Sequence, residues 1–167
     1  MPRKTLHSAT RDYEAKISHE AAHLVRGTAD IGPEPFGDPF SGILLVAEPA
    51  TGATGAKMVD ALRRSLAAVK LERAYVTWSH PNLLEEMLSL EPTALVAIGA
   101  AARAIDSLNY PLAKTQFSEA TEGSWFAWTE GASGLRLPAL VPALSDAAAK
   151  RRFWQAFLAI RALAPDS

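Results

Sequence analysis

The sequence predicts an α/β domain, a three-layer α/β/α sandwich around a central, mostly parallel sheet of about four or five strands. Short apolar runs of strand length alternate with longer segments whose apolar residues recur at helical spacing. The first three runs are apolar throughout, as is typical of strands buried on both faces of a parallel sheet. This alternation favours helices on both faces of the sheet.

Length and composition indicate one domain over residues 1–167. A chain of 167 residues is large enough to bury its own core. Its hydrophobic fraction of 49% is ordinary for a globular protein and argues against disorder. We expect an N-terminal helix over about residues 10–26, a loop rich in proline and glycine over 30–42, and the core over about 42–163.

Apolar periodicity assigns the remaining elements. Met58, Leu62 and Leu66 form the inner stripe of one helix. In the last helix, Phe153 and Phe157 mark the face expected to be buried. We predict strands at 43–47, 74–78, 93–98, 124–129 and 137–141, and helices at about 56–69, 82–90, 99–107 and 146–163. Parallel sheets bind ligands beyond the carboxyl ends of their strands. The loops where a ligand site is expected are therefore 48–55, 78–82, 99–101 and 142–146.

Charge and cysteine content narrow the function classes. The formal net charge is −1, so the chain lacks the basic excess of a dedicated nucleic-acid binder. There are no cysteines, which excludes disulfides, thiolate-bound clusters and cysteine nucleophiles. We see neither a signal peptide nor an apolar stretch long enough for a membrane span, so we expect a cytoplasmic protein with no membrane partner.

Two short motifs have both a chemical and a plainer interpretation. The sequence from His19 through Glu20 to His23 matches the His-Glu-x-x-His zinc motif, and Asp30 lies downstream. Two exposed or half-exposed histidines on a peripheral helix are the preferred interpretation, so a zinc hydrolase is only a third hypothesis and we predict no metal. The Gly-Ala-Thr-Gly run at 52–55 precedes a helix, where an ordinary tight turn is favoured over a phosphate site.

A family resemblance appears when these segments are taken in order. The run Ile-Leu-Leu-Val-Ala-Glu-Pro at 43–49 is similar to the first strand and active-site motif of the uracil-DNA glycosylase superfamily. Further segments resemble that superfamily at 55–62, 74–78, 91–102, 123–128 and 150–157, so that the likeness covers about residues 20–163. It implies a glycosylase-like α/β fold.

The same resemblance implies a vestigial site at Glu48, Pro49, Trp78, Ala143 and Ser145. Glu48 keeps the water-activating position. Trp78 stands where the family has an asparagine that reads the flipped base, and indole offers one donor and no acceptor. Ala143 stands where a histidine stabilises the departing uracil. The loop after Glu48 is short and the cluster-binding cysteines are missing, so we expect neither glycosylase activity nor a cofactor.

One branch of the superfamily has the fold without the activity. Pro-Ala-Leu-Ser-Asp at 142–146 and Phe-Trp-Gln at 153–155 resemble the psi subunit of the bacterial DNA polymerase III clamp loader. The Trp-x-Leu-Arg peptide typical of psi N-termini is missing from the sequence. We therefore expect a non-catalytic, psi-like protein with a protein partner in replication or repair. Trp125, Trp128 and Trp154 are candidate anchors, although we expect Trp154 to pack in the core.

The alternative is a DNA glycosylase with an altered substrate and other catalytic residues. Glu48 or Asp146 would then activate water. DNA is a weaker partner candidate, and the cations offered for phosphate contacts are Lys57, Arg63, Lys150, Arg151 and Arg152.

Overall fold

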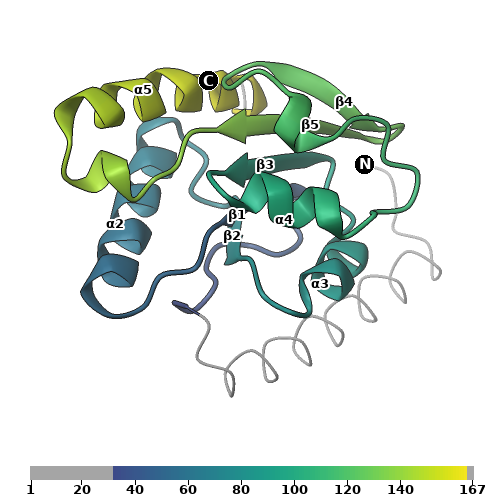
Figure 1. Ribbon diagram of the computed structural model, residues 1–167, viewed down its shortest axis with the longest axis horizontal. Helices are drawn as coiled ribbons and strands as arrows, with labels where there is room; N and C mark the ends of the chain where they lie inside the picture. The colour runs from purple at the N-terminus through teal and green to yellow at the C-terminus, as the bar shows by residue number, and fades with distance from the viewer. Residues whose placement is uncertain (1–31, 165–167) are drawn as a thin grey trace, which may run out of the picture.

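A computed structural model describes residues 32–164 and shows an α/β domain with one five-stranded sheet (Figure 1). The strands follow the order β2-β1-β3-β5-β4. Three parallel pairings join the first four strands of that order, and β4 runs antiparallel to β5 at the edge. The strands are β1 (Ile43–Ala47), β2 (Tyr75–Trp78), β3 (Ala94–Ile98), β4 (Trp125–Thr129) and β5 (Ala132–Leu137). The predicted mostly parallel sandwich is thus confirmed.

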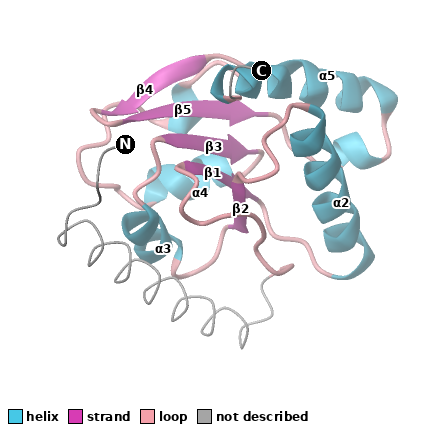
Figure 2. Ribbon diagram, turned by 180° about the vertical axis from the view of Figure 1, so that it is seen from behind, coloured by secondary structure: helices cyan, strands magenta, loops and turns pink. Residues whose placement is uncertain are grey.

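Helices cover both faces of the sheet (Figure 2). The core on one face includes residues of α2 and α5, and the core on the other includes residues of α3 and α4. The helices are α2 (Gly52–Ala68), α3 (Leu83–Leu90), α4 (Ala101–Ser107) and α5 (Ala147–Phe157), with 3₁₀ segments η1 (Phe117–Glu119), η2 (Pro142–Leu144) and η3 (Leu158–Leu163). Within residues 32–164 no helix is long and apolar enough to cross a membrane.

The central strands supply side chains to both layers because successive residues of a strand point to opposite faces. In β1, Leu45 and Ala47 join the core beneath α2 and α5, whereas Leu44 and Val46 join the core beneath α3 and α4. All four are buried. Burial of each large aliphatic side chain contributes about 1.5–3 kcal/mol, which explains why this run is apolar throughout.

The start of α2 differs from the prediction. The helix begins at Gly52, whereas the glycines at 52–55 predicted a turn and a helix start near residue 56. Gly55 belongs to the first helical turn, where a Cβ atom would lie 2.4 Å from the Ala50 carbonyl oxygen. Gly55 therefore permits the loop before α2 to pack closely against the first turn of the helix, and it does not end the helix.

The last strand also differs from the prediction. It spans Ala132–Leu137, not 137–141, although the later residues are more apolar. β5 lies between β3 and β4 and bonds to both. Pro138 has no N–H to donate to such a ladder, so the strand ends before it.

The last predicted helix divides into α5 and η3. Asp146 caps α5 by accepting a hydrogen bond from the Ala149 amide at 2.8 Å. Phe153 and Phe157 are buried as predicted. The expectation that Trp154 packs in the core was wrong, because its side chain is 36% exposed. The predicted helix at 10–26, with His19, Glu20 and His23, lies outside the described residues.

Candidate functional site

Glu48 lies at the carboxyl end of β1, facing the start of α4. Its Oε2 lies 3.4 Å from the amide nitrogen of Ala100, which donates to it. Gly99 adopts a φ of +61°, and a Cβ atom there would lie 3.0 Å from Glu48 Oε1 and 2.9 Å from the Ala139 Cα. A glycine is therefore needed where the backbone after β3 approaches this half-buried carboxylate.

Trp78 fills the position that the resemblance equates with base reading. Its side chain is 0% exposed and belongs to the core beneath α2 and α5. The indole Nε1 is buried and has no hydrogen-bond partner among the described residues. A Cβ atom on Gly32 would lie 3.3 Å from Pro49 Cβ and 3.7 Å from Trp78 Cγ. Trp78 is thus a core residue that presents no polar atom to a ligand.

Ala143 lies in η2 and lines a groove between α2 and α5. The groove has a volume of about 340 Å³, and Lys57 and Lys150 line it too. Ala143 itself is 6% exposed. The structure therefore brings one residue of the predicted site together with two of the predicted cations. Glu48 and Trp78 are not among the groove's lining residues.

The other predicted residues are scattered over the surface. Pro49, Arg63 and Arg151 are exposed, as is Ser145. The Arg63 guanidinium lies 4.4 Å from the centroid of the Phe36 ring, a cation–π contact. The Arg63 guanidinium therefore already has a contact within the domain.

Two further candidates have structural partners. Arg152 pairs with Glu122, with Nη2 and Oε2 2.6 Å apart. Asp146 is engaged as the cap of α5, which weakens its candidacy as the residue that activates water. The predicted site residues therefore form no single catalytic constellation among the described residues.

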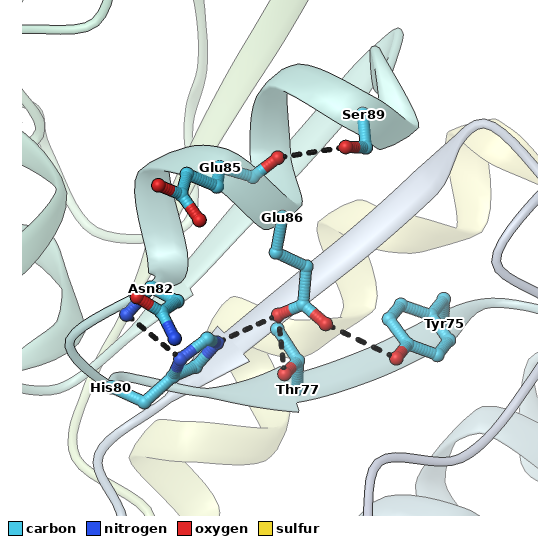
Figure 3. Close-up of polar contacts among 7 residues, drawn as sticks. All are labelled: Tyr75, Thr77, His80, Asn82, Glu85, Glu86 and Ser89. Atoms are coloured by element: carbon cyan, nitrogen blue, oxygen red, sulfur yellow. Dashed lines mark hydrogen bonds and ion pairs between the residues drawn. The ribbon is translucent and has the colours of Figure 1, made fainter. Parts of the chain in front are cut away.

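A buried polar cluster, which the sequence did not suggest, joins β2 to α3 (Figure 3). Glu86 is completely buried. Its Oε1 accepts hydrogen bonds from Thr77 Oγ1 at 2.8 Å and from His80 Nε2 at 3.0 Å, and its Oε2 accepts one from the Tyr75 hydroxyl at 3.3 Å. A buried carboxylate is tolerated because these donors replace water.

The cluster also sets the proton position on His80. The Asn82 amide donates to His80 Nδ1 at 3.1 Å, so this nitrogen is an acceptor. The ring proton then lies on Nε2, which points to Glu86. These bonds fix the loop that follows β2 to the start of α3. One signal in the sequence was available, since Glu86 lies one turn after Leu83 and beside Met87 on the inner stripe of α3.

Metal chemistry finds no support in the described part of the chain. Among residues 32–164, no group of three or more histidine, aspartate or glutamate side chains is arranged to hold a metal ion. His19 and His23 lie outside those residues.

Comparison of the sequence with protein-family models and with curated proteins gives no match.

Proposed function

We propose that this protein is a non-catalytic member of the uracil-DNA glycosylase-like fold that acts by binding another protein in DNA replication or repair, in the manner of a clamp-loader psi subunit. The proposal combines the resemblance over about residues 20–163 with the chemistry of the positions it equates with catalysis. A protein partner is favoured over DNA because the formal net charge is −1.

The burial of Trp78 is the observation on which the proposal rests. Glycosylases bind an extruded base by hydrogen bonds to its edge. At the equivalent position this chain has an indole that is 0% exposed and belongs to the hydrophobic core. Ala143 adds a second loss, because a methyl group cannot stabilise charge on a leaving base.

A glycosylase assay tests the absence of catalysis. The purified chain is incubated with oligonucleotides that contain uracil, hypoxanthine or xanthine, and abasic sites are then measured by alkaline cleavage. We expect no excision above the level without protein. The matched variant is Glu48→Gln, which keeps the shape of the side chain and removes its basicity. Excision by the wild-type chain that disappears in this variant would sink the proposal.

Co-purification tests the partner. The tagged chain is expressed in its source cell, and bound proteins are identified by mass spectrometry against a tag-only control. We expect subunits of the replication or repair machinery, clamp-loader subunits above all. Recovery of none of these proteins would contradict the assigned role.

A glycosylase with altered chemistry is the second candidate, and Glu48 is the observation that favours it. The half-buried carboxylate lies at the carboxyl end of a parallel strand, where α/β enzymes place reactive groups. The assay described above separates this candidate from the first.

A further inference from the structure

The groove between α2 and α5 has an apolar floor. Leu140, Ala143 and Phe153 line it and are buried in the same core cluster. Val141, next to the floor in sequence, is 38% exposed. The volume of about 340 Å³ lies near the lower end of the ~300–1,000 Å³ typical of ligand pockets. It suits one or two large side chains rather than a folded surface.

Trp154 gives the groove a rigid aromatic wall. Its ring stacks on Phe157, with centroids 5.6 Å apart and planes inclined by 17°. Phe157 is fully buried, yet Trp154 keeps 36% of its surface exposed. A tryptophan that is held by a buried ring loses little freedom when a partner covers it, and tryptophan is enriched among residues that dominate binding energy.

The rim of the groove is basic. Lys57 and Lys150 have no ion-pair partner among the described residues, whereas Arg64 pairs with Asp60 at 3.1 Å. Within residues 32–164, two ammonium groups without an ion-pair partner therefore flank an apolar floor, on a chain whose formal net charge is −1. Charge complementarity favours an anionic partner here.

From these observations we propose, resting on the proposed protein-binding function, that the groove binds a short acidic peptide segment of the partner, anchored by a large apolar side chain. The anchor fills the floor against Trp154 and the carboxylates lie near Lys57 and Lys150. Single-stranded DNA fits less well. A strand-binding site combines a row of cations with several stacking rings, whereas Trp154 is the one aromatic side chain exposed among the described residues that line this groove.

The test begins with a random-peptide phage library selected on the full chain. Enriched peptides are synthesised with a fluorescein label, and their affinities are measured by fluorescence anisotropy. We expect sequences in which aspartate or glutamate flanks phenylalanine, leucine, isoleucine or tryptophan. Enrichment of basic peptides, or of no peptide, would overturn the proposal.

Two variants then locate the binding site. Reversal of both rim charges (Lys57→Glu with Lys150→Glu) and loss of the wall (Trp154→Ala) should each weaken binding by about tenfold. The matched control is Lys70→Glu with Arg103→Glu, which makes the same change in net charge at exposed positions outside the groove. It should change affinity by less than about twofold, because salt screens remote surface charges. Equal losses in the control and the rim variant would contradict a site in the groove.

Competition with oligothymidine distinguishes a peptide site from a nucleic-acid site. Unlabelled oligothymidine should not displace the peptide. Displacement, together with oligothymidine binding that is lost in the rim variant, would make the groove a nucleic-acid site and overturn the proposal.

The experiments distinguish failure of the peptide-binding proposal for the groove from failure of the proposed function. Co-purification of replication proteins that survives both groove variants would overturn the groove and leave the proposed function standing. Glycosylase activity would remove the proposed function, whereas peptide binding in the groove would still be measured directly.

Discussion

At the residue scale, Glu86 and Trp78 differ in whether their buried polar atoms have hydrogen-bond partners. The Glu86 carboxylate accepts hydrogen bonds from Tyr75, Thr77 and His80. The Trp78 Nε1 lacks a partner among the described residues. An unmet buried donor costs about 1–3 kcal/mol, so Trp78 stabilises the core by less than its size suggests.

Substitution of His80 tests the polar cluster. In His80→Ala, the Asn82 amide loses its acceptor and Glu86 loses one donor. We expect the free energy of unfolding to fall by about 1–3 kcal/mol, measured by urea unfolding at neutral pH. Glu85→Gln is the matched control, since Glu85 lies beside Glu86 on α3 but is exposed. It should change stability by less than about 0.5 kcal/mol, and a similar loss in both variants would contradict a specific role for the cluster.

At the element scale, the β4–β5 hairpin depends on a missing side chain. Gly134 of β5 pairs with Phe126 of β4. The Phe126 ring lies across the glycine and contacts Phe117 edge to face, with centroids 4.9 Å apart. A Cβ atom at Gly134 would lie 2.4 Å from Phe126 Cζ.

Gly134→Ala should therefore displace the Phe126 ring and lower the free energy of unfolding by about 1–3 kcal/mol, as overpacking commonly does. Thermal and urea unfolding measure the loss. Gly131→Ala is the control in the same hairpin, because a Cβ there meets no atom within 4 Å. Unchanged stability in Gly134→Ala would show that the ring moves aside at little cost.

The elements also show which parts of the fold and of the site could be predicted from the sequence alone. The strands β1 and β3 were predictable because strands buried on both faces need no polar residues, and β2 departs from this pattern at the buried Thr77. The limits of β5 were not, since Ser133 and Arg136 belong to it for reasons of pairing rather than apolarity. Among site residues, the helical pattern places Glu86 inside, but its partners depend on how α3 lies on β2, which periodicity does not specify.

At the scale of the whole molecule, two groups should shape stability against pH. The Arg73 guanidinium, hydrogen-bonded to Asp38, lowers the pKa of that carboxyl below its ordinary value of 3.8. Burial, with the nearby charge of Glu91 as a lesser cause, raises the pKa of Tyr110 above its ordinary value of 10.0. The folded state is therefore favoured by the ionised form of Asp38 and by the protonated form of Tyr110.

The two contributions disappear at opposite ends of the pH range. Asp38 contributes fully above its ordinary pKa, and this contribution is lost as pH falls through the lowered pKa. Tyr110 contributes fully below its ordinary pKa, and this contribution is lost as pH rises through the raised pKa. Asp38→Asn should reduce the loss of unfolding free energy at acid pH (the acid limb of the stability curve), by less than about 1 kcal/mol because Arg73 is largely exposed. Tyr110→Phe should likewise reduce the loss of unfolding free energy at alkaline pH (the alkaline limb).

Urea unfolding at a series of pH values measures both limbs, and each variant serves as the control for the other. Asp38→Asn should leave the alkaline limb unchanged, and Tyr110→Phe should leave the acid limb unchanged. A change in the wrong limb would contradict the assignment of that group.

The antiparallel edge of the sheet has a consequence for the order of folding. β4 and β5 are separated by Glu130 and Gly131 alone, so their pairing closes a short loop, and hairpins of this kind form within about 1–10 μs. The parallel pairings are slower to find, because Ile43 must meet Ala94, and Ala94 must meet Ser133, across long stretches of chain. We therefore expect the β4–β5 hairpin to form first, and β3 and then β1 to pair onto it along the free edge of β5.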